Sequence, residues 1–370
     1  METPNSSWFY GGPTYKQTKM LCWNALKALS PPYFVKNISE TDLTITYLNG
    51  SQLWVIGFDK RERFEGKERW NGGVLDEYAN MDAEVWPNTV EPALRDSGGP
   101  CHFIGKPVGR NHYFELSEFA RSGVDAEWED FNWWTEDVLD PLEIAKAKAR
   151  VDERTFNQEY RGEFVSYEGR AYVYHDTSVH RVVKPFNPEL PVTCALDFNI
   201  SPCLWELAQI DRENVHFFDE IRQTGTDIWR MCAELKRRLE KRGLRPGARL
   251  VFYGDYTSAS RRDVSATAAS WDIIRGEFHQ WQPQFRLRKN PNIVDRINAV
   301  NSRLRSADGR VRLTYDPKCA ELGKDFELVD MEMLTTKKGQ AGDRTHASDA
   351  VGYLVHYEWD ILGRGGIEVG

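Results

Sequence analysis

The stretch from Val192 to Asn199 (VTCALDFN) constrains the fold of this chain more than any other part of the sequence. It is a short apolar run between Pro191 and Ser201-Pro202, which is the pattern of a buried β-strand bounded by turns. The strand ends on an acid, Asp197. A carboxylate at the tip of a central strand is costly to leave without a metal ion, a cation or water. The sequence therefore predicts a strand that delivers a carboxylate to one edge of a sheet.

Two later segments place acids in matching positions. The apolar strand Leu250–Gly254 is followed by Asp255, and a helix that begins at His346 carries Asp349 in its first turns. Carboxylate oxygens of this kind suit Mg²⁺ or Mn²⁺. One acid at a strand end is more often a turn residue, so the prediction depends on the three together. We expect Asp197, Asp255 and Asp349 to form an oxygen-lined site for a divalent metal ion; their catalytic role and the binding of two ions are implied by the resemblance described below.

Two further residues are candidates for the same site. Glu220 stands near a strand end in Phe217–Ile221 and is predicted as an additional metal ligand, with an ordinary surface carboxylate as the alternative. His346 lies three residues before Asp349, so the two share one helical face. It would orient that acid or the substrate, or else serve only as a capping or packing residue.

The elements around these acids are predicted in the order βββαβααβα. The first three strands form an antiparallel meander, and Thr226 is the expected N-cap of the helix that follows. The predicted strands are 192–198, 204–210, 215–221, 250–254 and 311–314, and the later helices are 291–305 and 346–359. This order resembles the ribonuclease H-like nuclease fold. In that fold two divalent cations held by such acids align a water molecule and the scissile phosphate.

The first half of the chain alternates strands and helices and is also predicted as α/β. Asn49-Gly50 between two apolar runs predicts a two-residue hairpin. Gly72–Leu75, followed by Asp76 and Glu77, resembles a Walker B strand, in which the Asp holds Mg²⁺ and the Glu polarises the attacking water. The G-x-x-x-x-G-K-[ST] phosphate loop occurs nowhere in the sequence. Without that cradle we expect no ATP turnover by this chain.

Charge and cysteine content narrow the classes of protein. The chain has 370 residues and a net charge of −8, which allows two domains and excludes a general nucleic-acid coat protein. Its six cysteines show neither paired nor zinc-type spacing, as is typical of a reducing cytoplasm. No segment approaches the roughly 20 apolar residues of a membrane span. We therefore expect a protein of the cytoplasm that does not contact membranes.

Two basic runs could follow a phosphate backbone. Lys236–Arg249 contains seven basic residues and one acid, and Arg286–Arg312 contains eight basic residues and two acids. Solvated helix faces explain either run alone. Next to a phosphodiesterase site, DNA contact becomes the better explanation for one of them. The residues predicted to contact DNA are Arg286, Arg288, Lys289, Arg296 and His346.

The domain limits are predicted from changes in composition. Residues 125–143 hold eight carboxylates and three tryptophans without a Lys or Arg, which indicates a solvated connector. We expect the end part of an ATPase domain at 1–165, a linker at 166–190 and the nuclease domain at 191–370.

Taken together, these motifs resemble the large terminase subunit of tailed bacteriophages, over nearly the whole chain. Gly12–Thr18 is similar to the segment that follows the Walker A region of that family, Gly73–Met81 with Phe64–Gly66 to its Walker B region, Ile104–Leu116 to its coupling motif, Phe156–Phe164 to the end of its motor domain, and Asn290–Asn301 and His346–Tyr353 to its nuclease domain. Two features depart from the family: the Walker A portion is absent, as in a chain that is truncated or starts at an internal Met, and Lys106 stands where a small hydroxyl residue is usual.

The resemblance implies a DNA-packaging nuclease joined to an incomplete motor. It implies cleavage of concatemeric double-stranded DNA in the host cytoplasm, two Mg²⁺ or Mn²⁺ ions, and the portal protein, the small terminase subunit and a homo-oligomer on the portal as partners. Two alternatives stay open: a recombinase or junction nuclease on the same fold, and a non-catalytic prophage remnant that only binds packaging partners.

Overall fold

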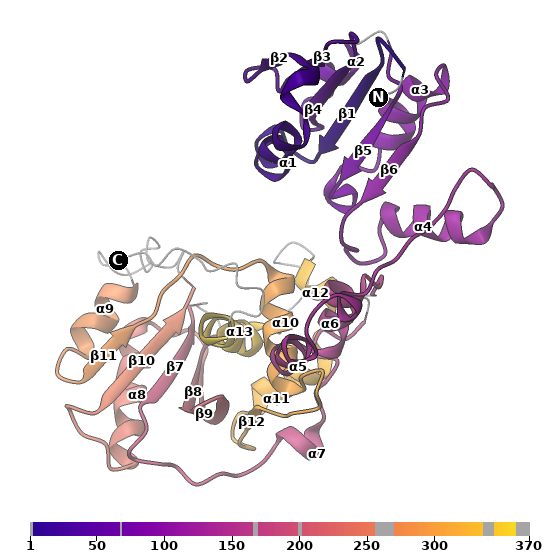
Figure 1. The fold of residues 1–370 in the computed structure, drawn as a ribbon. Coiled ribbons are helices and arrows are strands. Elements are labelled where there is room, and N and C mark those ends of the chain that lie inside the picture. The colour runs from indigo at the N-terminus through magenta and orange to yellow at the C-terminus, as the bar shows by residue number, and fades with distance from the viewer. Residues whose placement is uncertain are drawn as a thin grey trace. The chain divides into compact units, whose positions relative to one another are not determined.

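The computed structural model describes residues 3–66, 69–165, 169–198, 202–255, 270–335 and 344–359, which form two compact units (Figure 1). The first unit comprises Met1–Trp134 and Asn157–Ser166, and the second comprises Thr135–Phe156 and Tyr167–Gly370. The chain therefore changes unit three times: inside the acidic stretch 125–143, inside helix α6 (Glu153–Arg161), and after residue 166.

The first unit contains a six-stranded sheet in the order β2-β3-β4-β1-β5-β6. Strands β1, β4, β5 and β6 are parallel, whereas β2 and β3 join β4 as an antiparallel extension. The strands are β1 (Ser7–Gly12), β2 (Val35–Ser39), β3 (Thr44–Tyr47), β4 (Gln52–Gly57), β5 (Gly72–Asp76) and β6 (Cys101–Ile104). The predicted hairpin at Asn49-Gly50 joins β3 to β4, but four residues, 48–51, connect these strands instead of two.

Short helices accompany this sheet. The longest, α1, begins at its N-cap Thr14, whose hydroxyl accepts a hydrogen bond from the Gln17 amide at 3.3 Å. It buries Cys22 and Trp23 against apolar residues of β3 and β4. The α-helices are α1 (Tyr15–Leu29), α2 (Glu62–Glu65), α3 (Glu91–Arg95) and α4 (His112–Ser122); short turns of other helix types are η1 (Pro32–Phe34), η2 (Tyr78–Asn80) and η3 (Trp86–Val90).

The second unit also contains a six-stranded sheet, in the order β11-β10-β7-β8-β9-β12. Strands β7, β8 and β9 form the predicted antiparallel meander, and β10 lies parallel to β7. The strands are β7 (Val192–Asp197), β8 (Cys203–Asp211), β9 (Asn214–Gln223), β10 (Arg249–Gly254), β11 (Gln282–Phe285) and β12 (Leu313–Tyr315). The predicted mixed α/β class is confirmed, with β11 as a strand that the sequence did not predict.

Helices cover both faces of this second sheet (Figure 1). On one face α8 and α9 pack on Cys194 and Leu196 of β7; on the other, α10, α11 and α13 form a core with Ala195. Since side chains alternate along a strand, Asp197 points to the same face as Ala195. The helices and turns are η4 (Thr135–Asp137), α5 (Pro141–Arg150), α7 (Thr177–His180), α8 (Ile228–Lys241), α9 (Ser270–Glu277), α10 (Ile293–Leu304), α11 (Ala320–Leu328), α12 (Met331–Thr335) and α13 (His346–Glu358).

Several local predictions need correction. The N-cap of α8 is Asp227 and not Thr226, because the Asp227 carboxylate accepts the Arg230 amide at 2.8 Å. Helices α11 and α12 were not predicted. The described part of the predicted linker 166–190 is not an open connector, since Ala171 and Tyr172 are buried in the core around α10 and α13. No helix among the described residues is long and apolar enough to cross a membrane.

Candidate active site

Two of the predicted acids meet at the ends of neighbouring parallel strands. Leu196 of β7 is in register with Gly254 of β10, so Asp197 and Asp255 each follow one residue later at the same level. Adjacent strands lie about 4.8 Å apart, and residues in register share a face. The amide of Asn290 donates to the Asp255 carboxylate at 2.6 Å, which fixes its direction. Strand pairing thus brings two carboxylates to one point on the α13 face.

Helix α13 adds the third acid and the histidine. It packs on β7, β8 and β10. His346, its first residue, places Nδ1 2.8 Å from a carboxylate oxygen of Asp197. Burial lowers the pKa of His346, but its hydrogen bond to Asp197 and the charges of Asp197, Asp349 and Asp325 outweigh burial and raise that pKa. His346 therefore orients Asp197, which is one of the roles predicted for it.

Tyr353 of α13 is half-buried. Burial raises the pKa of Tyr353 to about 12; the charge of Arg296 lowers that pKa, and the charges of Asp349, Asp255 and Asp197 raise it. Geometry places Asp197 beside Asp255, and Asp349 lies one helical turn after His346, which contacts Asp197.

Asp349 is held from two sides. A guanidinium nitrogen of Arg296 on α10 forms an ion pair with one carboxylate oxygen, and the Thr345 hydroxyl donates to the other at 3.3 Å. Arg296 also stacks on the Tyr353 ring, 4.8 Å from its centroid. Arg296 was predicted to contact DNA, but its side chain is only 9% exposed and is paired. Its position instead makes it the partner of Asp349.

Glu220 lies in a different cluster from the three aspartates. Its carboxylate accepts hydrogen bonds from the amides of Glu321 and Leu322, each at 3.0 Å, in the first turn of α11. Directly across the strand pair stands Glu206, which is fully buried. Burial, and then the charge of Glu220, raise the pKa of Glu206 well above its usual value. With its oxygens engaged in this way, Glu220 does not fit the predicted role of metal ligand.

The donor set partly fits a divalent cation. Asp197 and Asp255 present carboxylate oxygens at neighbouring strand ends, the ligand type that Mg²⁺ and Mn²⁺ prefer. Asp349 has both oxygens engaged by Arg296 and Thr345. In the described part of the chain, no group of three or more His, Cys, Asp or Glu side chains is arranged as a metal site. The residues that fit best as ligands are therefore the two strand-end aspartates.

The acids of the first unit have different surroundings. The Tyr10 hydroxyl donates to Asp76 at 2.6 Å, and the Glu77 amide donates to it at 2.9 Å. Glu77 adopts a left-handed conformation with φ of 55°, which a non-glycine residue adopts only at a steric cost. Asn80 donates to its carboxylate at 3.1 Å. No ion pair involves Asp76 or Glu77 among the residues described.

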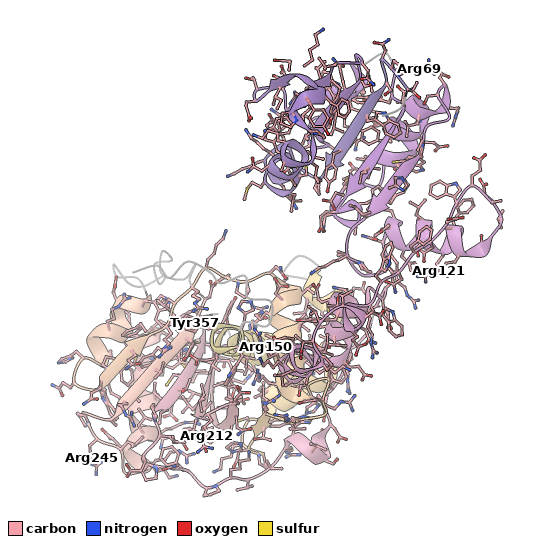
Figure 2. All side chains as sticks on the ribbon, viewed as in Figure 1. Arg69, Arg121, Arg150, Arg212, Arg245 and Tyr357 are labelled. Carbon is pink, nitrogen blue, oxygen red and sulfur yellow. The ribbon has the colours of Figure 1, made fainter. Side chains whose placement is uncertain are left out.

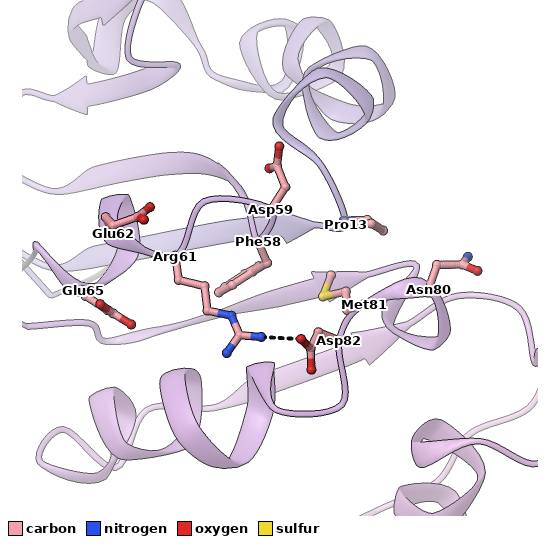
Figure 3. A pocket seen from close by; sticks show the side chains of 9 residues that line it. All are labelled: Pro13, Phe58, Asp59, Arg61, Glu62, Glu65, Asn80, Met81 and Asp82. Atoms are coloured by element: carbon pink, nitrogen blue, oxygen red, sulfur yellow. Dashed lines mark ion pairs between the residues drawn. The ribbon is translucent and has the colours of Figure 1, made fainter.

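A hollow of about 590 Å³ lies close to these acids, beyond the carboxyl ends of β1 and β4 (Figure 3). Four acids line it, Asp59, Glu62, Glu65 and Asp82, and the one cation among its described lining residues, Arg61, is paired with Asp82 at 2.9 Å. The remaining lining residues are Pro13, Phe58, Asn80 and Met81. Since like charges repel, this hollow does not suit the phosphates of a nucleotide.

The predicted DNA-contact segment leads directly to the second unit's acids. Arg286 and Lys289 are exposed between β11 and α10, just before Asn290. Arg288 stacks on Tyr357 of α13, with its guanidinium carbon 4.0 Å from the ring centroid (Tyr357 is labelled in Figure 2). Arg286 pairs with Glu358 of α13 at 3.6 Å, and Lys289 directly precedes Asn290, the residue that donates to Asp255.

The sequence did not reveal several residues that build this site. Asn290 carries a weak signal, since it precedes Pro291 at the predicted start of helix 291–305, which in the structure begins at Ile293. Arg296 and Tyr353 fall within helical patterns that look like ordinary packing or solvated faces. Asp325 of α11 accepts the Ser348 amide of α13 at 2.9 Å, and its helix was not predicted at all.

Comparison with known proteins gives a clear result for the fold only. No family model matches the sequence, and no curated protein matches it. The large terminase from a thermophilic bacteriophage superposes with a TM-score of 0.58 at 17% identity, over 96% of this chain and 86% of that chain. This chain has the fold of a large terminase. The same phage protein in complex with ATP-γ-S gives a TM-score of 0.57 at 17% identity (96% and 86% covered), and with ADP 0.57 at 18% (96% and 87%).

The large-terminase fold predicted from the motifs is thus confirmed. The superposition covers nearly the whole chain, so it includes both sheets.

Proposed function

We propose that this chain is a phage large terminase subunit whose second unit is a metal-dependent endonuclease, cutting concatemeric double-stranded DNA during genome packaging. The observation that carries the proposal is the parallel pairing of β7 with β10, which sets Asp197 beside Asp255, together with the contact of His346 on α13 with Asp197, within a large-terminase fold. The reaction would be hydrolysis of a phosphodiester bond.

Each residue of the site has a role in this reaction. Asp197 and Asp255 hold Mg²⁺ or Mn²⁺, two ions in the proposed complete site, and Asp349 completes the acidic set. Bound divalent cations would supply positive charge to the scissile phosphate and lower the pKa of the attacking water. His346 fixes one oxygen of Asp197, and Asn290 fixes Asp255. Arg296 forms an ion pair with Asp349, and its positive charge offsets the repulsion between this carboxylate and the other two.

DNA would reach the site along the segment that precedes α10. Arg286 and Lys289 are exposed there and can neutralise phosphates. Arg288, held against Tyr357, offers a further guanidinium edge. Because these cations lead into Asn290, a bound backbone would be directed toward Asp255.

The first unit is proposed as part of a packaging motor, and we propose no ATP hydrolysis by residues 1–370. Asp76 and Glu77 are its Walker B acids, without a phosphate loop in the sequence. Partners would be the portal protein, the small terminase subunit and further copies of the chain on the portal, in the host cytoplasm.

Cleavage of supercoiled plasmid tests the nuclease. The purified chain should nick and linearise plasmid with Mn²⁺ or Mg²⁺, lose activity with EDTA and recover it when the metal is added back. A fourfold DNA junction offered in competition separates the alternatives: strong preference for the junction would favour a recombinase or junction nuclease. Absence of metal-dependent cleavage of either substrate would favour a non-catalytic remnant.

A further inference from the structure

Helix α13, which carries two residues of the site, has no N-terminal cap of its own. Thr345 occupies the N-cap position, but its side chain makes no capping hydrogen bond to the helix amides. Its φ of 148° is one that a β-branched residue rarely adopts. Its hydroxyl donates instead to the Asp349 carboxylate. The residue that would ordinarily cap the helix is therefore used to hold the site's third acid.

The missing cap is supplied by another helix. The Asp325 carboxylate of α11 accepts the Ser348 amide at 2.9 Å. Ser348 is the third residue of α13, one of the positions whose amide an N-cap side chain normally serves. Asp325 is buried, and burial together with the nearby charge of Asp349 raises its pKa to about 6. A buried carboxylate in such surroundings is costly, and the hydrogen bond to this helix end offsets part of that cost.

Helix α11 is also capped by a carboxylate from another element. Helix α11 begins after Cys319, which makes no capping hydrogen bond, and the Glu220 carboxylate from β9 accepts the amides of its first turn. Glu220 thus holds α11, and Asp325 of α11 holds α13. Two carboxylates connect the sheet to the helix that carries Asp349 and His346.

We propose that Asp325 is a positioning residue for the nuclease: by capping α13 from α11, it leaves Thr345 to hold Asp349 and sets Asp349 and His346 against the strand-end aspartates. The proposal rests on the endonuclease function proposed above. Without the Asp325 carboxylate, the Thr345 hydroxyl would have to turn toward the open Ser348 amide, and so away from Asp349, to cap the helix. Asp349 would then lose its second hydrogen bond, and the first turn of α13 would fray where His346 reaches Asp197.

Three variants of the full chain test this role. Asp325→Ala removes the cap, whereas Asp325→Asn keeps an oxygen that can accept the Ser348 amide. Asp152→Ala is the matched control, because Asp152 is also fully buried and caps a helix, accepting the Thr155 amide at 3.1 Å in the first turn of α6. The two readouts are hydrogen exchange of the peptide covering 345–352, and kcat and KM for Mn²⁺-dependent plasmid cleavage.

We expect Asp325→Ala to speed exchange in the first turn of α13 and to lower kcat by about 10- to 100-fold, as for residues that orient metal ligands, with KM for DNA unchanged. Asp325→Asn should restore both, and Asp152→Ala should affect α6 without affecting α13. Unchanged exchange or unchanged kcat in Asp325→Ala overturns the proposal, as does equal damage from Asp152→Ala or no rescue by Asp325→Asn. If the wild-type chain does not cleave DNA, the proposed function fails, while the exchange data still decide whether Asp325 caps α13.

Discussion

The two units place acids at the ends of parallel strands in the same way, yet they surround these acids with different chemistry. In the first unit the Asp76 carboxylate accepts hydrogen bonds from the Tyr10 hydroxyl and the Glu77 backbone amide. In the second unit, Asp197 contacts the imidazole of His346, Asp255 accepts a hydrogen bond from the Asn290 side-chain amide, and Asp349 pairs with the Arg296 guanidinium. The second set includes cationic groups, and the acids come from three elements that converge. The acids of the first unit, Asp76 and Glu77, come from one strand and the turn that follows it.

This difference explains why one acidic strand end is a candidate reaction centre and the other is not. Converging carboxylates repel each other, so they stay together only where cations or hydrogen-bond donors hold them. Arg296 and His346 do this in the second unit. In the first, the nearby hollow adds four more acids, and the cation among its described lining residues, Arg61, is paired with Asp82.

The largest effect expected is on cleavage. Asp197→Asn should abolish Mg²⁺- or Mn²⁺-dependent plasmid cleavage and leave the fold intact, because it removes charge at nearly constant shape. Asp255→Asn and Asp349→Asn should do the same. Glu220→Gln should be milder, since its oxygens face α11. Asp76→Asn in the first unit is the matched control and should cleave like wild type. Full activity of the purified Asp197→Asn protein would remove that residue from the site.

The next effect concerns stability. Arg296→Ala should destabilise the second unit by about 3–5 kcal/mol, because it leaves the buried Asp349 carboxylate without its cation. The side chains of this pair are only 9% and 5% exposed. Urea unfolding of the full chain, followed by tryptophan fluorescence, measures the loss.

Arg310→Ala provides the contrast for that measurement. Arg310 pairs with Asp308 at 2.9 Å, but its side chain is 67% exposed. An exposed pair contributes only about 0–1 kcal/mol. Equal losses in the two variants would mean that the Arg296–Asp349 pair is not what holds the site together.

A smaller effect is expected on DNA affinity. Replacing Arg286, Arg288 and Lys289 with Ala should reduce the slope of log affinity against log salt by about one unit for each phosphate that the variant no longer neutralises. Fluorescence anisotropy of labelled duplex DNA across a salt series measures this slope. Arg237→Ala is the control, because Arg237 is exposed on α8, on the opposite face of the sheet. An unchanged slope in the triple variant would assign these side chains to an ordinary solvated surface.

The sequence predicted the three aspartates because each carries a local signal. An apolar run that ends on an acid predicts a strand end, and the parallel pairing of β7 with β10 then sets Asp197 beside Asp255. The fold class followed from the order of such elements. What makes these positions recognisable is short-range: a strand, its length and the residue that closes it.

The partners of these acids carry no such signal. Arg296 and Asp349 are 53 positions apart in sequence and meet only because α10 packs on α13. Arg296 lies in the basic run Arg286–Arg312, and the sequence predicts DNA contact for it together with that run. Glu220 was misplaced for the same reason, since the amides that it accepts belong to a helix about 100 positions later that the sequence did not predict. Tertiary packing, and not local pattern, decides these roles.

The last prediction is that a substitution in the first unit has no effect on ATP hydrolysis. We predict no steady-state ATPase activity for this chain, and no change when Glu77 is replaced by Gln. A Walker A loop provides backbone amides around the phosphates, a Lys for the β- and γ-phosphates and a hydroxyl for Mg²⁺, and the sequence contains no such loop. What the first unit offers instead are carboxylates: Asp76, Glu77 and the acids of the hollow.

Phosphate release with Mg²⁺-ATP, measured for wild type and Glu77→Gln, tests this. If the wild type hydrolyses ATP and Glu77→Gln does not, the first unit forms a working nucleotide site. The two units would then both be active sites, and they would differ only in their substrates. DNA cleavage should be equal in both proteins, because the nuclease acids belong to a sheet with its own core.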